Sequence, residues 1–321
     1  MESYELSMLY THMLSSIDFT IPTIAILDLA AAVDTWIIDG DCGAIVYGRP
    51  RVGKTRAIHY ISQELKQKYG KDLPVYVLNM TDHKPSQKYF YSEVLKVISH
   101  NEAHKGTASM MKERLVNTLI LESQETPHRR VVLFIDEAFL LTEKDFIWLM
   151  DIHNNLDMYN VHLTVLMFGT NELKGIKSAY CQARRFQIVD RFMVEEYEYK
   201  GVASAKDALA CLHNMDIALS NYPGKPILTQ TFFPGAFADK KRLAACANVL
   251  WDAFLELSQD NNIPAIDIPM KYFMKAIVYC LKTYGMYGKG IYFPDQTAWA
   301  DSVFNSGYKK SFESIGYPHI N

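Results

Sequence analysis

Residues 44–55 read AIVYGRPRVGKT, and this stretch decides the fold class. Its last part, Gly48 to Thr55, fits the pattern GxxxxGK[ST] at every fixed position. A short apolar run typical of a buried strand precedes the pattern, and helical periodicity follows it over 54–69. A strand, a glycine-rich turn and a helix in this order form a loop whose backbone N–H groups point at phosphate oxygens, with the positive end of the helix facing the same anion. The stretch therefore predicts a phosphate-binding loop.

The side chains of this loop have separate expected roles. We expect Lys54 to reach the β- and γ-phosphates of ATP and the Thr55 hydroxyl to bind Mg²⁺. The alternative is a chance match to a short pattern, and the strand-turn-helix setting argues against it. The residues expected to bind the nucleotide are Gly48, Arg49, Pro50, Arg51, Val52, Gly53, Lys54, Thr55 and Arg56.

A second motif, Val131 to Glu137, is an apolar run that ends in two adjacent acids. Ligands of parallel sheets bind at the carboxyl ends of the strands, where these acids lie. We expect Asp136 to complete the Mg²⁺ site and Glu137 to orient and activate the attacking water. An ordinary solvated strand end is the alternative. Together, the two motifs predict hydrolysis of ATP with Mg²⁺.

Two later strand junctions carry further candidates. Asn171 follows the apolar run 161–168, and it either contacts the γ-phosphate or the attacking water or simply begins a turn. Arg191 precedes the expected fifth strand, with Arg184 and Arg185 nearby. An arginine at a subunit edge can neutralise transition-state charge in a neighbour's site. Each of the three arginines is otherwise an exposed helix-end residue.

The chain alternates strands and helices as far as residue 200. Strands are expected at 44–47, 75–79, 131–135, 161–168 and 193–199, and helices at 23–38, 54–69, 89–99, 109–122 and 144–159. This order predicts an α/β fold with a five-stranded parallel sheet and helices on both faces. Beyond residue 200, expected helices follow one another at 203–219, 241–257 and 269–284.

These patterns divide the chain into four parts. We expect an N-terminal extension over 1–20, a nucleotide-binding α/β domain over 21–200 and a small helical domain over 201–284. An aromatic-rich tail covers 285–321, and we expect it to fold against the helical domain rather than to bind a partner.

Composition limits the partners and the location. The 321 residues carry 33 Lys and Arg against 36 Asp and Glu, so the net charge is −3 and DNA binding would have to come from a local patch. The 5 cysteines are widely spaced, which indicates a reduced cytoplasmic protein without a disulfide framework. The most apolar stretch, 21–38, is interrupted by Asp28 and Asp34, so no membrane span is predicted.

The motifs and their order resemble the AAA+ ATPases and, more narrowly, the TnsC/TniB family of transposition regulators. The resemblance covers roughly residues 22–280. It rests on both nucleotide motifs, on Asp34-Thr35-Trp36 in the first expected helix, on Lys105-Gly106-Thr107 before a later helix, and on the segments LMFGTNELKGI and IVDRFMVEEYEY. It implies an AAA+ nucleotide-binding domain followed by a helical lid.

The resemblance also implies a function. Such proteins bind ATP, assemble head-to-tail as rings or helical filaments around duplex DNA with little sequence preference, mark a target site and recruit the DDE transposase. ATP hydrolysis drives disassembly. The target is chosen by either a sequence-specific DNA-binding protein or an RNA-guided complex. The implied location is the prokaryotic cytoplasm, with association to the nucleoid when the protein is active.

The resemblance assigns two arginines near the nucleotide. It implies that Arg191 acts in trans on the ATP of a neighbouring protomer, which requires head-to-tail packing. A lid arginine often follows a glycine at the start of a late helix in this family. The sequence here is PGAFADKKRLAA, so Arg242 is the best match and Lys241 is the alternative.

The resemblance also assigns the DNA contacts. It implies that Lys105 and Thr107 contact the phosphate backbone of DNA, with Lys84 and Lys88 as lesser candidates. From the residues alone, the span 84–130 is only slightly basic, and a solvated surface is the simpler interpretation. Two other functions fit the same motifs. One is an AAA+ or STAND-type ATPase that acts on a protein without DNA, and the other is a helicase loader.

Overall fold

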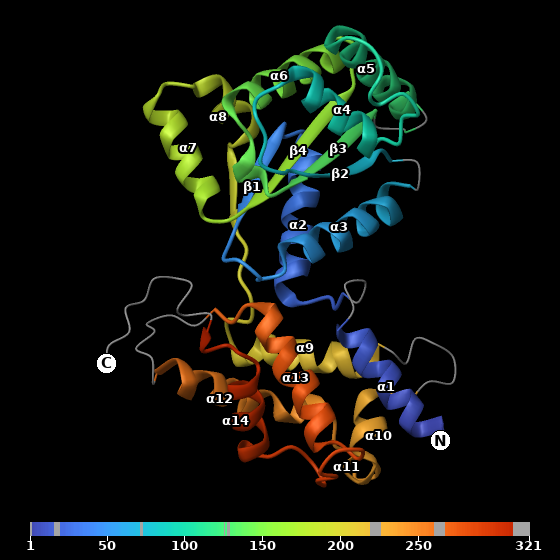
Figure 1. Ribbon diagram of the computed structural model, residues 1–321, viewed down its shortest axis with the longest axis vertical. Helices are drawn as coiled ribbons and strands as arrows, with labels where there is room; N and C mark the ends of the chain where they lie inside the picture. The colour runs from blue at the N-terminus through green and yellow to red at the C-terminus, as the bar shows by residue number, and fades with distance from the viewer. Residues whose placement is uncertain are drawn as a thin grey trace. The chain divides into compact units, whose positions relative to one another are not determined.

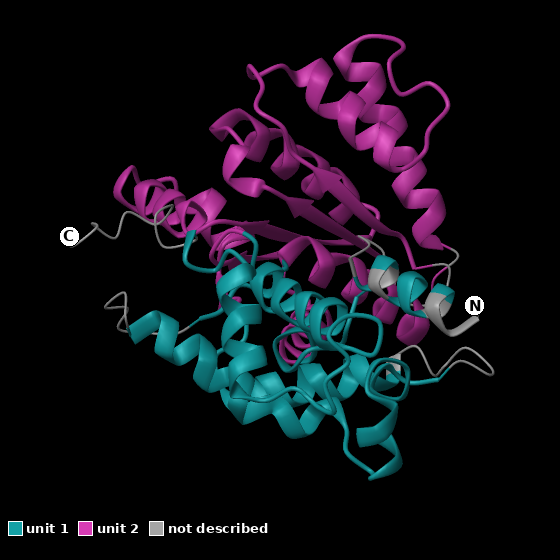
Figure 2. Cartoon of the chain, turned by 60° about the horizontal axis from the view of Figure 1, so that its bottom comes forward, with its two compact units in different colours: residues 1–27, 51–53, 200–321 teal, residues 28–50, 54–199 magenta. Residues whose placement is uncertain are grey.

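The computed structural model describes residues 2–15, 20–70, 73–124, 126, 129–218, 226–259 and 267–310. The chain forms two compact units, which Figure 2 shows in different colours. The α/β unit consists of residues 28–50 and 54–199, and the helical unit consists of residues 1–27, 51–53 and 200–321.

The α/β unit contains one five-stranded sheet in the order β2-β3-β4-β1-β5. Every pair of neighbouring strands is parallel, so the predicted parallel sheet is confirmed. The strands are β1 (Gly43–Tyr47), β2 (Val75–Asn79), β3 (Arg130–Asp136), β4 (His162–Gly169) and β5 (Glu195–Glu198).

Both faces of the sheet are covered. Side chains alternate between the two faces along each strand, so each face packs against different residues. From β3, Val131, Leu133 and Ile135 enter the core that α4, α5 and α6 share. The intervening Phe134 packs against Phe168 of β4 with ring centroids 5.9 Å apart. Figure 1 shows α2 and α3 on one side of the sheet and α4, α5 and α6 on the other. The central strands are therefore apolar on both faces, as the sequence predicts.

The helices of the α/β unit follow the predicted ranges closely as far as β4. They are α2 (Ile24–Asp39), α3 (Lys54–Tyr69), α4 (Gln87–Val97), α5 (Ala108–Gln124), the 3₁₀ turn η1 (Ala138–Leu140), α6 (Glu143–Asp157), α7 (Glu172–Gln182) and α8 (Phe186–Phe192). Neither α7 nor α8 is predicted from the sequence. In α7 only Leu173 is buried, so this helix has no apolar stripe from which to recognise it.

The helical unit contains the remaining helices of the described chain. They are α1 (Glu2–Ser15), α9 (Ala205–Ala218), α10 (Leu228–Phe232), α11 (Pro234–Ala238), the 3₁₀ turn η2 (Leu243–Cys246), α12 (Ala247–Gln259), α13 (Met270–Tyr284) and α14 (Gln296–Asn305). No helix is predicted over 1–20, yet α1 forms there and buries Tyr10 and Leu14. Residues 16–19 of the predicted extension lie outside the described part of the chain.

The expected tail contributes to the core of the helical unit. Asp295 caps α14 by accepting a hydrogen bond from the Ala298 N–H at 2.9 Å. Trp299 of α14 and Tyr308 are buried among residues of α12 and α13. No helix is predicted here from the sequence, because the Gly, Tyr and Phe residues of the preceding segment obscure the helical period. Residues 311–321 of the same tail are outside the described residues.

We expect Trp299→Ala to destabilise the protein by about 3–5 kcal/mol, because the substitution leaves a large cavity in a filled core. Phe304→Ala on the same helix is the matched control, since the Phe304 side chain is 64% exposed. Urea unfolding followed by circular dichroism measures both variants. Equal unfolding midpoints for the two variants would contradict the packing of this segment.

Candidate nucleotide-binding site

The predicted phosphate-binding loop lies at the carboxyl edge of the sheet. It follows β1 directly, and the Gly48 N–H donates a hydrogen bond to the Gly169 carbonyl at 3.2 Å, which ties the start of the loop to the end of β4. Gly53 has a φ of 114°, a conformation that L side chains rarely adopt, so the second fixed glycine is required by the backbone. The loop therefore has the curled shape that the pattern predicts.

Lys54 lies inside this loop. Its side chain is buried, and its ammonium group donates hydrogen bonds to the carbonyls of Gly48 at 2.9 Å and Arg49 at 3.1 Å. Burial lowers the pKa of Lys54, while the nearby carboxylates of Glu137 and Asp136 oppose that shift. The ammonium is thus positioned at the first turn of α3, where the N-terminal end of the helix also attracts an anion.

The two residues predicted to bind Mg²⁺ are in direct contact. The Thr55 hydroxyl donates a hydrogen bond to Oδ2 of Asp136 at 2.6 Å. The other carboxylate oxygen, Oδ1, accepts from the Glu137 N–H at 3.0 Å, which fixes the orientation of the carboxylate. A hydroxyl and a buried carboxylate are hard oxygen donors of the kind that Mg²⁺ prefers. These residues therefore fit the ion.

Glu137 follows the metal candidate in a constrained conformation. Its φ of 54° and ψ of 38° are left-handed, which costs free energy for a residue with a side chain. Burial and the charge of Asp136 raise the pKa of Glu137, Lys54 opposes the shift, and Glu172 adds to it. A carboxylate with a raised pKa accepts a proton more readily, which suits a general base.

Asn171 lies at the same edge of the sheet as the loop. It comes two residues after the end of β4, whose last carbonyl accepts from Gly48. Asn171 begins α7 as its N-cap residue but makes no side-chain capping bond, so its exposed amide is available to a ligand. The adjacent Glu172 was missed by the sequence analysis. Its carboxylate accepts a hydrogen bond from the Thr170 hydroxyl at 3.2 Å, and its charge raises the pKa of Glu137. The signal that could have identified Glu172 is an acidic residue shortly after the end of a strand.

Arg191 lies at the opposite edge of the sheet. It is the penultimate residue of α8, followed by Phe192. The backbone of Phe192 lies against Gly43, the first residue of β1, so closely that a methyl group added at Gly43 would lie 2.8 Å from the Phe192 Cα. The phosphate-binding loop follows the other end of β1. The Arg191 guanidinium donates to Oδ1 of Asn154 and lines a groove of about 500 Å³ between α6 and α8. Arg191 is therefore separated from the loop of its own α/β unit by the length of a strand.

The other predicted loop and lid residues have the following positions. Val52 is buried, and within the helical unit Arg51 donates to the Tyr272 hydroxyl at 2.6 Å. Arg242 stacks on Phe237 with its guanidinium carbon 4.2 Å from the ring centroid, and Lys241 lies 4.9 Å from the centroid of Tyr292. Both lid candidates thus rest on aromatic rings of the helical unit. Arg49, Pro50 and Arg56 lie in or beside the loop itself.

The candidate DNA contacts of the α/β unit lie at the two ends of α4. Lys84 and Lys88 lie at its N-terminal end, and Lys105 and Thr107 lie in the turn between α4 and α5. Lys84 and Lys88 are exposed and make no ion pair within the described residues. Lys105 is also exposed but pairs with Glu102 at 3.3 Å. The Thr107 hydroxyl accepts from the Met110 N–H at 3.3 Å and so caps the start of α5. Nε2 of His83 lies 3.1 Å from Oδ2 of the buried Asp145, and this contact anchors the segment that carries Lys84.

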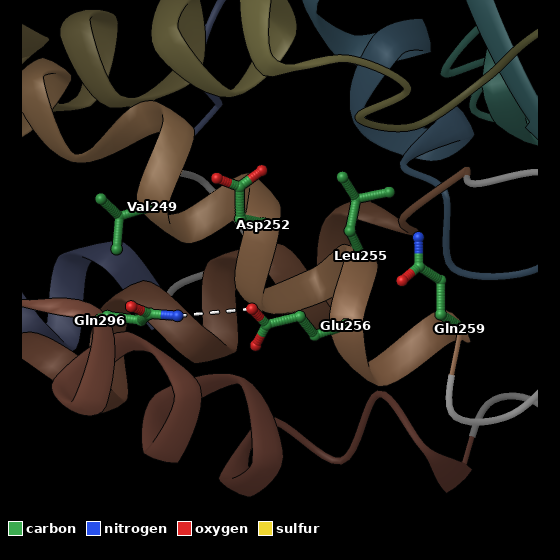
Figure 3. A pocket seen from close by; sticks show the side chains of 6 residues that line it. All are labelled: Val249, Asp252, Leu255, Glu256, Gln259 and Gln296. Atoms are coloured by element: carbon green, nitrogen blue, oxygen red, sulfur yellow. Dashed lines mark hydrogen bonds between the residues drawn. The ribbon is translucent and has the colours of Figure 1, made fainter.

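A second groove lies in the helical unit, between α12 and α14 (Figure 3). Its volume is about 330 Å³, and Gln296 donates to Glu256 across it at 3.4 Å. No predicted site residue lines it.

Across the described ranges, no cluster of three or more potential metal-binding side chains occurs and no helix is long and apolar enough to cross a membrane.

Comparisons with known proteins concern the domain family and the fold. Residues 39–176 match the family model of an AAA domain. The chain is similar in structure to the ORC2 protein of Aeropyrum pernix in its ADPNP–ADP complexes, with a TM-score of 0.59 and 12% identity over 91% of this chain and 71% of that chain. For Drosophila ORC bound to DNA, the TM-score is 0.49 and the identity 12% over 97% and 68% of the chains.

A third solved structure is domain III of the replication initiation protein DnaA of Thermotoga maritima, with a TM-score of 0.46 and 12% identity over 89% of this chain and 94% of that chain. At such identities a structural likeness concerns the fold alone. No protein with curated annotation matches the chain in sequence. The fold is the AAA+ P-loop fold, and the AAA domain identifies the chain as an ATPase.

We expect Glu137→Gln to lower kcat for ATP hydrolysis by about 10²–10⁴-fold, because it removes the carboxylate expected to act as general base. Nucleotide affinity should stay unchanged, since Lys54 and the loop are intact. Phosphate release and titration with a fluorescent ATP analogue measure the two quantities. Glu143→Gln is the matched control, because this carboxylate lies on α6 and pairs with Arg185 at 2.9 Å. Full activity of Glu137→Gln would mean that another residue acts as the general base.

Proposed function

We propose that this ATPase is an ATP-dependent switch that assembles head-to-tail on duplex DNA and regulates DNA transposition. The observation that carries the DNA-binding part is the exposed turn Lys105-Gly106-Thr107 at the start of the 17-residue helix α5. A lysine, a hydroxyl and the first N–H groups of a helix are together suited to a phosphate of the DNA backbone.

The nucleotide is ATP bound with Mg²⁺. The backbone N–H groups of the loop and the Lys54 ammonium hold the phosphates, and Thr55 with Asp136 holds the metal ion. When bound, Mg²⁺ supplies positive charge that stabilises the phosphate oxygens during transfer. Glu137 accepts the proton of the attacking water, and the Asn171 amide orients that water or the γ-phosphate.

Assembly completes the catalytic site. Because Arg191 lies one strand length from its own loop, it serves the nucleotide of a neighbouring protomer, where it neutralises charge in the transition state. Such an interface joins two different surfaces of the same chain and is therefore heterologous, which produces a ring or a helical filament. The lid contact to the nucleotide comes from Arg242 or from Lys241.

DNA binding follows assembly. Lys105 and Thr107 contact the backbone, and Lys84 and Lys88 add charge at the N-terminal end of α4. Each protomer contributes few contacts, but their repetition along the assembly gives strong, salt-sensitive binding without base recognition. The sequence resemblance to the TnsC/TniB family supports the biological role. In this role the assembly marks the target, recruits a DDE transposase, and disassembles on hydrolysis.

A second candidate function is an ATPase switch that acts on a protein partner without DNA. The pairing of basic residues with carboxylates favours it, because Lys105 contacts Glu102 at 3.3 Å and Lys112 contacts Asp151 at 2.9 Å. These pairs reduce the positive potential of the surface that the first proposal uses. DNA binding therefore discriminates between the two functions.

We expect hydrolysis to recover when two inactive variants are mixed. Arg191→Ala and Glu137→Gln should each lose at least about 100-fold in kcat. Random mixing at equal amounts pairs an intact Glu137 with an intact Arg191 at about a quarter of the interfaces of a head-to-tail assembly. Steady-state phosphate release measures the recovery. Arg184→Ala is the control and should hydrolyse ATP normally by itself. Loss of hydrolysis in Arg184→Ala that recovers on mixing with Glu137→Gln, together with an active Arg191→Ala, would make Arg184 the arginine that acts in trans.

We expect tight binding to a random-sequence duplex only with a non-hydrolysable ATP analogue, because assembly precedes DNA binding. Fluorescence anisotropy measures affinity with the analogue, with ADP and without nucleotide. Affinity should fall with salt and rise with duplex length. Lys54→Ala is the control, since it lacks the nucleotide contact. An active ATPase that binds no duplex in any nucleotide state would leave the protein-directed switch.

A further inference from the structure

Arg114 of α5 supports the turn that connects α4 to α5. Its Nη1 donates to the carbonyl oxygens of Glu102 at 2.7 Å and Lys105 at 3.2 Å. Its Nη2 lies 3.4 Å from the Glu102 carboxylate. One planar guanidinium thus contacts the backbone at two points of the turn and the side chain at one of them.

The rest of the turn is also held in a single shape. Ala103 is buried, and Nδ1 of His104 lies 2.8 Å from the Ser92 hydroxyl of α4. Gly106 has a φ of 97°, which other residues adopt only with strain. These contacts direct Lys105 and Thr107 outward, and the Lys105 side chain is 74% exposed.

Two basic side chains at this turn share one carboxylate. The Glu102 carboxylate is shared by Lys105 at 3.3 Å and Arg114 at 3.4 Å. A phosphate bound by Lys105 must replace Glu102 as its partner, and the released carboxylate would then repel the phosphate. Arg114 remains beside Glu102 and balances that charge, because its side chain is only 18% exposed and its donors point at the turn.

We propose that Arg114 is a positioning residue of the DNA contact: it shapes the Lys105–Thr107 turn and neutralises Glu102, without touching DNA itself. This inference rests on the proposed DNA-binding function. A lysine at this position would supply the charge but not the planar fork that reaches two carbonyls and a carboxylate. Arg114→Lys should therefore retain only part of the affinity.

A double-mutant cycle on the full-length protein tests the inference. Affinity for a random duplex is measured by anisotropy with the non-hydrolysable ATP analogue for Arg114→Ala, Lys105→Ala and the double variant. We expect each single variant to lose about tenfold, the loss expected for a charged hydrogen bond, and the double variant to lose little more than one of them. Additive losses would mean that Arg114 contacts DNA independently and would overturn the inference.

Glu102→Gln supplies a readout that a merely structural role would not change. Without the carboxylate no charge needs balancing, so Glu102→Gln should raise affinity alone and restore part of it in the Arg114→Ala background. If Glu102→Gln restores no affinity in the Arg114→Ala background, the neutralising role is overturned. The effect of Glu102→Gln in the otherwise unaltered protein can still be measured if Arg114→Ala is less stable. Lys112→Ala is the matched control on the same helix, since its charge is already paired with Asp151.

The two proposals fail in different ways. If the unaltered protein hydrolyses ATP but binds no duplex, the DNA-binding function fails and takes the inference with it. If the unaltered protein binds and Arg114→Ala binds equally well, only the inference fails. ATP hydrolysis in the absence of DNA should be the same in Arg114→Ala as in the unaltered protein, because Arg114 belongs to neither nucleotide motif.

Discussion

The hydrogen bond from Thr55 to Asp136 joins the segment that follows β1 to the end of β3, although these two strands are not neighbours in the sheet. Thr55 belongs to the loop after β1, Asp136 ends β3, and β4 lies between these strands. The 2.6 Å contact is possible only because all three strands end at one edge in matched register. Gly169 at the end of β4 accepts a hydrogen bond from the first N–H of the loop. The position of Lys54, the orientation of Asp136 and the unusual backbone of Glu137 all depend on this alignment.

The sequence predicts most of the α/β unit because its signals are local. The P-loop pattern needs only consecutive residues, and α3 and β2 were expected with the bounds that the structure has. The failures are helices whose burial is sparse or irregular. In α7 a single residue is buried. In α14 the burial of Trp299 depends on α12 and α13, which are distant in sequence, so no window around residue 299 contains the cause.

The candidate site was predictable where residues act on a ligand and unpredictable where they act on each other. Lys54, Thr55, Asp136 and Glu137 were assigned from chemistry and spacing, and the structure brings them together. The pairing of basic side chains with carboxylates could not be predicted from the sequence. Lys112 is neutralised by Asp151, which is 39 positions away, and a count of basic residues treats it as free. The same holds for Arg114, whose donors serve backbone carbonyls that carry no signal in a sequence.

The distance between Arg191 and its own loop gives an assembly a direction. In the head-to-tail arrangement proposed above, every interface matches one loop with one arginine, so an open filament always has a protomer at one end whose nucleotide meets no arginine. That end protomer hydrolyses slowly and stays bound, while interior protomers turn over. The two ends then have different lifetimes, as in other polar filaments, and the filament would shorten mainly by breaking inside rather than by losing the end subunit. A closed ring has no such end, so the kinetics of disassembly would reveal which of the two forms exists.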